Sequence, residues 1–286
     1  MHVPVMLGEC LEFLAPRPEG IYLDATAGLG GHTAAIAARL TTGFVIANDR
    51  DAESLELAKR NTAQWTDRIR YHPGSFGNLG AALRALGVER VDGLLADLGV
   101  SRYQLTEPER GFSLMADGPL DMRMDRSQDA TADEIVNFSQ EKQLADLIYR
   151  FGQERRSRKI SRAIVRARPI HTTRHLARVI EEVVPRTGKL HPATQTFMAL
   201  RLAVNDEQGE LDRFLEVAPD LVKSGGRIVA ISFMSLEDTK VKRSFQALAR
   251  AGRARILTKH VVRPAPEETV NNPPSRSAKL RALELQ

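Results

Sequence analysis

The stretch that decides the fold spans residues 21–32 and reads IYLDATAGLGGH. Its first four residues are rich in β-formers and end at Asp24, and a glycine-rich turn follows them directly. An alanine-rich helix is expected from His32 to Leu40. A short strand, a glycine turn and a helix in this order indicate that the backbone bends sharply and approaches a ligand closely.

Strand and helix patterns alternate through the rest of the N-terminal third. Runs typical of strands occupy residues 44–47, 69–72 and 91–96, and a helix is expected over 51–63. This alternation indicates βαβ units and a parallel sheet. The pattern returns near the C-terminus, with strands expected over 227–232, 254–259 and 278–285, a turn at 224–226, a helix over 238–249 and a proline-rich loop over 264–274.

The middle of the chain interrupts this alternation. Residues 105–190 contain no strand-like run, and their apolar residues recur at helical spacing. Thr131 with Glu134 three residues later is typical of a capping box at a helix start. We therefore expect an inserted all-helical domain over 105–191 within an α/β domain formed by 1–104 and 192–286, with one long helix over 193–217 leading back.

Composition restricts the class of protein. The chain has 286 residues, 42% of them hydrophobic, and a single cysteine, Cys10, so it has no disulfide framework and no multi-cysteine zinc site. No run approaches the roughly 18 consecutive apolar residues of a membrane span, and no secretory signal begins the chain. His171 and His175 stand four residues apart without a third ligand nearby. We expect a cytoplasmic protein with no membrane span and no metal.

The glycine turn is a candidate cofactor site. A nicotinamide fingerprint requires glycine at positions 28, 30 and 33, and position 33 is Thr33. Asp49 follows the second expected strand, where a carboxylate accepts both hydroxyls of a ribose. The pair indicates a nucleoside-bearing cofactor, and the alternative is a structural turn beside a solvated Asp49. Asp24 favours S-adenosylmethionine, which carries a sulfonium and an ammonium, over a nicotinamide dinucleotide with its phosphates.

Besides the glycine turn and Asp49, Asp97 is a candidate site residue, at the carboxyl end of the expected strand over 91–96. Open α/β sheets bind ligands at this edge. The carboxylate could accept a hydrogen bond from a substrate amine or from the cofactor, whereas its alternative role is to cap the helix that follows.

The charge of +5 is mild, but its distribution is uneven. Arg155, Lys159, Arg162 and Arg166 are spaced for one face of a helix, in a stretch with seven cations and no acid from Arg155 to Arg168. We call these four residues the basic stripe. Such a stripe attracts polyanions, and the alternative is a solvated helix face.

Taken together, these patterns resemble a known family, the bacterial small-subunit (16S) ribosomal RNA cytosine N4-methyltransferases of the MraW type. The resemblance covers nearly the full chain, and its most specific mark is the stretch from Gly118 to Asp125. The further marks are His2–Glu9, Gly30–Thr33, Asp49–Asp51, Asp97–Ser101, Gln104–Leu105, Glu109–Ser113, His191–Thr194, Thr196–Phe197, Arg201, Val204–Asn205, Ile231–Phe233 and Ser235–Asp238.

The resemblance implies a Rossmann-like class I S-adenosylmethionine-dependent methyltransferase whose inserted helical domain helps to recognise RNA. It implies methyl transfer from S-adenosylmethionine to the N4 amine of a cytidine in small-subunit rRNA, either as free rRNA or within the 30S subunit, and it leaves a homodimer open. Asp97 is the implied catalytic residue. Carried over position by position, the implied cofactor contacts are Gly30, Gly31, His32, Asp49, Phe76, Asp97 and Gln104.

The chain departs from the family pattern at a few positions. Met234 stands where the family usually has His, and Met198 where it usually has Gln. Methionine cannot replace the hydrogen bonds of either residue. Arg102, Thr239 and Pro274 also differ from the usual residues. Two rival functions are weighed. A nicotinamide oxidoreductase is disfavoured by Thr33 and Asp24, whereas a non-catalytic or altered-specificity rRNA-binding assembly factor that retains the fold is supported only by Met198 and Met234.

Overall fold

A computed structural model describes residues 4–186, 188 and 190–286 and divides the chain into two compact units. The first unit comprises Met1–Val100 and Gln208–Gln286, and the second comprises Ser101–Glu207. The second unit therefore includes residues 192–207, which the sequence-based prediction assigned to the α/β domain. Two residues of the N-terminal family motif, His2 and Val3, lie outside the described residues.

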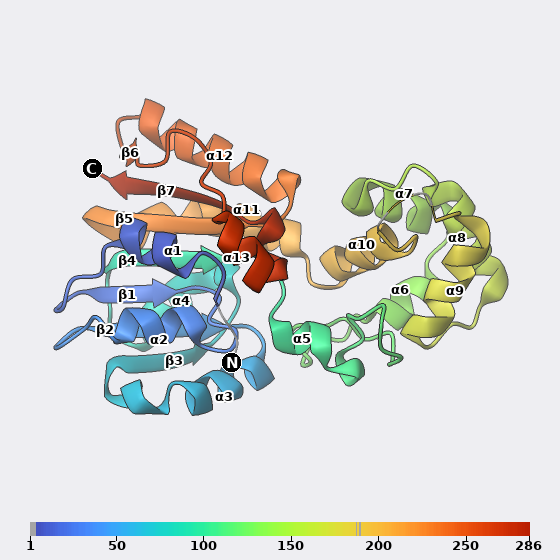
Figure 1. Cartoon of the computed structure of the whole chain (residues 1–286), viewed down its shortest axis with the longest axis horizontal. Helices are drawn as coiled ribbons and strands as arrows, with labels where there is room; N and C mark the ends of the chain where they lie inside the picture. Colours follow the sequence, from blue (N-terminus) through green and yellow to red (C-terminus); the bar gives the residue numbers. More distant parts are fainter. Residues whose placement is uncertain (1–3, 187, 189) are drawn as a thin grey trace. The chain divides into compact units, whose positions relative to one another are not determined.

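A seven-stranded sheet forms the centre of the first unit (Figure 1). The first five strands in space are parallel, and β7 is antiparallel to both of its neighbours. The expected parallel α/β fold is confirmed. In spatial order the strands are β3 (Ile69–Pro73), β2 (Phe44–Asp49), β1 (Ile21–Asp24), β4 (Val91–Asp97), β5 (Val222–Ser232), β7 (Lys279–Leu285) and β6 (Ala254–Ile256).

Helices cover both faces of the sheet, and successive strand residues point to opposite faces, so both sets of strand side chains are buried. Val45 and Ala47 pack into one apolar cluster with residues of α1 (Leu7–Leu14), α2 (Gly31–Ala37) and α3 (Ala52–Asn61). Ile46 packs into the other cluster with residues of α4 (Leu79–Ala85), α11 (Glu207–Val217) and α12 (Ser235–Arg250). This packing leaves the strand ends as the place where polar side chains gather.

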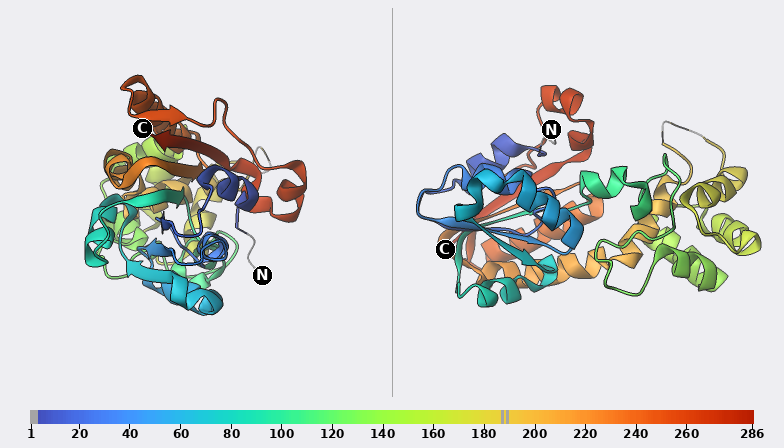
Figure 2. Two further views of the ribbon diagram at one scale, coloured as in Figure 1. Left: turned by 90° about the vertical axis from the view of Figure 1, so that its left-hand side faces the viewer. Right: turned by 90° about the horizontal axis from the view of Figure 1, so that it is seen from below.

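The C-terminal segment differs from the prediction at two places. The expected turn at 224–226 lies inside β5, where Gly225 has φ 76° and the pairing with β4 shifts register. The expected proline-rich loop over 264–274 contains a short helix, α13 (Pro266–Asn271). Pro266 begins this helix and two acids follow in its first turn, which favours helix formation. Figure 2 shows α13 beside the N-terminal segment, where Glu268 accepts the backbone N–H of Met6 at 2.8 Å.

The second unit is helical, as expected, and its described residues contain no strand. Thr131 and Glu134 form the predicted capping box. Pro119 and Thr172 form an isolated antiparallel bridge. It joins the loop that contains Pro119 to the N-cap of the helix that begins at Thr173. The helices are α5 (Arg102–Thr106), α6 (Ala132–Phe138), α7 (Glu141–Gly152), α8 (Ser157–Ala167), α9 (Thr173–Val183) and α10 (Thr194–Val204).

The expected single helix over 193–217 is wrong, because α10 and α11 are separate helices. The chain breaks at Asn205 and Asp206, and Asp206 takes a left-handed conformation with φ 45°. Short polar residues tolerate this conformation better than others. Arg201 and Glu207 brace the break with two hydrogen bonds of 2.8 and 3.0 Å.

None of the helices in the described part of the chain combines the length and hydropathy that a membrane span requires.

Candidate functional site

Three neighbouring strands of the sheet each end in an aspartate. Asp49, Asp24 and Asp97 are the last residues of β2, β1 and β4, which lie side by side and run parallel. Their carboxyl ends therefore meet at one edge of the sheet, where open α/β folds bind ligands. Burial raises the pKa of each of the three carboxyl groups to about 6. Three carboxyl groups therefore lie at this edge of the sheet, which suits the binding of a positively charged ligand.

Asp49 is oriented by the backbone. Its Oδ2 accepts the N–H of Gly28 at 2.7 Å, and its Oδ1 accepts the N–H of Asp51 at 2.9 Å. A carboxylate has about four acceptor positions, so two remain for further donors. The arrangement fits the two hydroxyls of a ribose, and Asp49 is half-buried rather than solvated.

Asp24 is satisfied by the protein. Its side chain is fully buried and accepts the hydroxyl of Thr33 at 2.6 Å and the N–H of Thr26 at 3.3 Å. Asp24 therefore holds the glycine turn in place, and its charge acts on a ligand only from a distance. Position 33 is threonine, where the nicotinamide fingerprint requires glycine, and the structure gives the reason: the hydroxyl of Thr33 donates to Asp24.

Asp97 has an unmet hydrogen-bonding capacity. Its Oδ1 is buried and has no hydrogen-bond partner among the described residues, while its Oδ2 lies 3.9 Å from Nδ1 of His32. Its backbone N–H donates to Oγ1 of Thr26 at 2.7 Å, which fixes the end of β4. The alternative that Asp97 caps a helix is wrong, because Ser101 is the N-cap of α5.

His32 lies in the first turn of α2 and is 6% exposed. Its Nε2 lies 3.0 Å from the carbonyl oxygen of Val5. Since a carbonyl oxygen only accepts, Nε2 donates in this contact, and Nδ1 faces Oδ2 of Asp97 at 3.9 Å. The ring thus joins the N-terminal segment to the acidic edge.

The glycines of the turn are required by close packing within the protein. Gly30 has φ 85°, and a Cβ there would lie 2.7 Å from Cγ2 of Thr62. A Cβ on Gly31 would collide with the ring of Pro4. A larger residue at either position would displace α2 from its neighbours. Packing within the protein is thus enough to explain both glycines, and their contact with a cofactor remains a prediction.

Phe76 follows β3 in a short 3-10 turn and is half-buried. Its ring meets Phe214 of α11 edge to face, with centroids 5.8 Å apart and an interplanar angle of 70°. The remaining expected contact, Gln104, belongs to the second unit. It is 3% exposed and forms a capping box with Ser101. The structure therefore brings Gly30, Gly31, His32, Asp49, Phe76 and Asp97 into the first unit.

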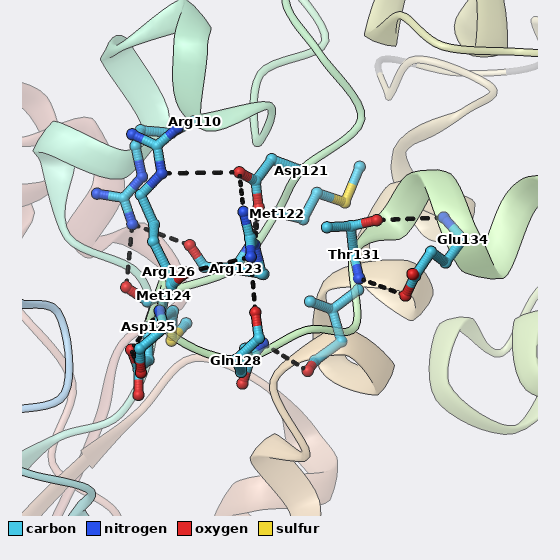
Figure 3. Close-up of polar contacts among 12 residues, drawn as sticks. Arg110, Asp121, Met122, Arg123, Met124, Asp125, Arg126, Gln128, Thr131 and Glu134 are labelled. Atoms are coloured by element: carbon cyan, nitrogen blue, oxygen red, sulfur yellow. Dashed lines mark hydrogen bonds and ion pairs between the residues drawn. The ribbon is translucent and has the colours of Figure 1, made fainter.

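The most specific family mark, from Gly118 to Asp125, forms a closely bonded loop in the second unit (Figure 3). Arg123 donates to both oxygens of Asp121 at 2.7 and 3.1 Å. Arg110 is 1% exposed and donates to the carbonyls of Arg123 and Met124. Asn205 accepts the N–H of Met124 at 2.7 Å. These residues hold the backbone of the loop, a role that the motif alone did not reveal.

The basic stripe is exposed, as a nucleic-acid contact requires. Lys159, Arg162 and Arg166 lie on α8, and Arg155 precedes that helix. The stripe is not free of acid: Glu141 of α7 lies with Oε1 3.6 Å from Nε of Arg162. The acid comes from a neighbouring helix, which the local sequence did not disclose.

Other side chains singled out in the sequence have ordinary partners. His171 Nδ1 lies 2.7 Å from Asp133, and within the described residues no three His, Cys, Asp or Glu side chains are grouped to hold a metal. Met234 is the N-cap of α12: its backbone N–H donates to Glu237 at 3.1 Å, and its carbonyl accepts the N–H of Asp238 at 3.1 Å. Met198 is half-buried on α10 in the second unit.

The fold and the acidic edge together define a class of protein. A sheet in the order β3-β2-β1-β4-β5-β7-β6 with an antiparallel β7, a glycine turn after β1 and an acid at the end of β2 is that of a Rossmann-like class I S-adenosylmethionine-dependent methyltransferase. The MraW methylase family matches residues 1–286, and the chain belongs to this family.

Relatives support this assignment over the whole length. The ribosomal RNA small subunit methyltransferase H of Solibacter usitatus is 66% identical over 286 residues, covering 100% of both chains. The protein of the same name from Acidobacterium capsulatum is 48% identical and covers 99% of this chain and 98% of its own. A solved rRNA methylase from Streptococcus thermophilus covers 100% of this chain and 99% of its own, with a TM-score of 0.48 and 12% identity. That last similarity is too low to indicate function.

Proposed function

We propose that this protein transfers a methyl group from S-adenosylmethionine to the N4 amine of a cytidine in small-subunit ribosomal RNA. Membership of the MraW methylase family supports the reaction class, and the names of the relatives support the RNA. The structural observation that carries the proposal is Asp97, whose Oδ1 is buried at the edge where three acids meet and has no hydrogen-bond partner in the described part of the chain.

The residues at this edge fit S-adenosylmethionine. Asp49 retains acceptor positions for the ribose hydroxyls, and the half-buried ring of Phe76 would lie against adenine. Gly30, Gly31 and His32 would adjoin the amino acid end beside Asp97, with the buried Asp24 acting from a distance. For Gln104, which belongs to the second unit, the cofactor contact rests on the family resemblance alone. When bound, the cofactor supplies a methyl carbon made electrophilic by its sulfonium.

Asp97 has two roles in this proposal. An exocyclic amine on a base is a weak nucleophile, because its lone pair is delocalised into the ring, so catalysis depends on holding the nitrogen in line with the methyl carbon. Asp97 would accept an N–H of the amine and orient it. Its raised pKa of about 6 leaves it ionised at neutral pH and able to accept the proton that the methylated nitrogen loses.

The exposed basic stripe on α8 would bind phosphates of the RNA, because such contacts depend on charge and not on sequence. The substrate is rRNA, free or within the 30S subunit. Cytoplasmic action follows from that substrate, and the single free, buried Cys10 suits a reducing compartment.

Methylation in vitro tests the proposal. Purified protein, S-adenosylmethionine carrying a labelled methyl group and undermethylated small subunits should yield N4-methylcytidine at one position, identified by mass mapping. The Asp97→Asn variant should yield little or none. Cofactor binding without methylation of subunits or of free rRNA would overturn the proposal in favour of an assembly factor, the reading that Met198 and Met234 left open.

A further inference from the structure

We infer that Glu210 is a positioning residue for the adenine side of the cofactor site, because it fixes the loop that carries Phe76. This inference rests on the proposed function, since it takes Phe76 as the surface for adenine. Glu210 lies on α11 and is separated by more than a hundred residues from the loop that it holds.

The contacts of Glu210 converge on the loop from both sides of Phe76. Its Oε2 accepts the hydroxyl of Ser75 and the backbone N–H of Gly77, the latter at 2.9 Å. Its Oε1 accepts Nη2 of Arg213 at 2.7 Å, which fixes the carboxylate plane. Glu210 itself is 8% exposed. A buried carboxylate with these three donors holds the two residues that flank Phe76.

The glycine beside Phe76 is explained by the same contact. A Cβ at position 77 would lie 2.7 Å from Oε2 of Glu210, so only glycine admits the carboxylate this close. One helical turn further along α11, Phe214 meets the ring of Phe76 edge to face. Two side chains of one helix face, four residues apart, therefore set both the backbone and the ring of Phe76.

The start of the loop is fixed independently. Asn48 donates from Nδ2 to the carbonyl of Gly74 at 2.8 Å, and the N–H of Gly74 donates to the carbonyl of Asp49. Removing Glu210 would therefore free the part of the loop that contains Phe76 while leaving the end at Asp49 in place. The cost of ordering that part would then fall on cofactor binding, since an unordered binding loop lowers affinity.

A double-mutant cycle tests this inference, with S-adenosylhomocysteine as the probe and calorimetry as the measurement. We expect Glu210→Ala to weaken binding about tenfold in the native background and less than about twofold in the Phe76→Ala background, because the two residues act on one contact. Glu210→Gln, which keeps an acceptor oxygen, should stay within about threefold of the native affinity. Glu216→Ala, an exposed glutamate on the same helix, is the matched control and should change nothing.

Equal losses in both backgrounds, or native affinity in Glu210→Ala, would overturn the inference while leaving the proposed function intact. Failure of the native protein to bind S-adenosylhomocysteine would overturn both. If Glu210→Ala does not fold, Ser75→Ala removes one of the same hydrogen bonds without removing a buried carboxylate. It should show the same dependence on Phe76 with a smaller loss, and independence from Phe76 would refute the inference.

Discussion

The backbone N–H of Gly28 donates to Oδ2 of Asp49 across 2.7 Å and so joins the turn after β1 to the end of β2. The acid expected to bind the ribose is therefore tied to the glycine turn before any ligand arrives. A carboxylate held in this way has little rotational freedom to lose on binding, which favours affinity.

Replacing Asp49 with alanine should weaken cofactor binding without unfolding the protein. Losing charge-assisted hydrogen bonds to two hydroxyls costs about 1.5–3 kcal/mol, which is roughly a 10- to 150-fold rise in Kd. Calorimetry with S-adenosylhomocysteine measures the change, and Asp67→Ala, at a largely exposed acid, is the control. Native affinity in Asp49→Ala would remove Asp49 from the site.

Asp97→Asn should retain the fold and lose most of the methyl transfer. The amide has nearly the same shape but cannot accept a proton, so we expect the single-turnover rate to fall by about 100-fold or more. The rate is measured with saturating cofactor, and circular dichroism checks the fold. An unchanged rate would show that Asp97 neither orients the amine nor accepts its proton.

Cofactor binding should strengthen as pH rises through about 6. Burial raises the pKa of Asp24, Asp49 and Asp97 from 3.8 to about 6, and a cationic ligand favours their ionised forms. The folded, ligand-free protein then holds more protons than the unfolded chain between about pH 4 and 6. Its free energy of unfolding should therefore fall as pH rises through that window.

Two measurements check this pH dependence. Calorimetry of S-adenosylmethionine binding at pH 6, in buffers of different ionisation enthalpy, should detect proton release from the protein. Denaturant unfolding of the free protein should show the fall in stability. Proton uptake on binding, or stability that rises between about pH 4 and 6, would contradict the assigned shifts.

Reversing charges in the basic stripe should weaken RNA binding. Lys159→Glu with Arg166→Glu changes two exposed cations that form no ion pair with any residue of the described ranges, whereas Arg162 is partly neutralised by Glu141. Loss of two phosphate contacts on single-stranded RNA should reduce the slope of log affinity against log salt by about 1.4. S-adenosylhomocysteine binding should stay unchanged, because the contacts proposed for it, apart from Gln104, lie in the first unit.

The matched control for the stripe is Arg178→Glu with Arg186→Glu, two exposed arginines of the same unit. It alters the net charge equally and should leave the salt slope close to native if the stripe is the contact. Equal effects of the two double variants would show that RNA responds only to total charge. Native binding by the stripe variant would make the stripe a solvated face.

The strand pattern placed each of the three acids correctly at the end of a strand, because buried strands are short apolar runs and the residue that ends each run is visible in the sequence. Asp24, Asp49 and Asp97 were each placed at a strand end from such runs, and β1, β2 and β4 confirm this. The spatial order of these strands, β2-β1-β4, comes from the structure.

Contacts between segments that are distant in the sequence leave no local sequence pattern comparable with that of a strand. Helical periodicity continues across Asn205 and Asp206, so the break between α10 and α11 was not predicted; it depends on tertiary bonds such as that from Asn205 to Met124. The same holds for Glu141 opposite Arg162 and for Glu210 opposite Gly77, because each pair is brought together only by packing. For α13, the prolines suggested a loop, although Pro266 begins a helix.

The position of β7 has a consequence for how the chain is made. β7 follows β6 in the sequence, yet it lies between β5 and β6 inside the sheet. The helical unit, by contrast, is one continuous segment, Ser101–Glu207. On the ribosome, that segment emerges complete while β4 still lacks its neighbour β5, and β6 must wait for β7, the strand with which it pairs, before it joins the sheet. Deleting β7 would therefore remove an interior strand and separate β6 from the rest of the sheet.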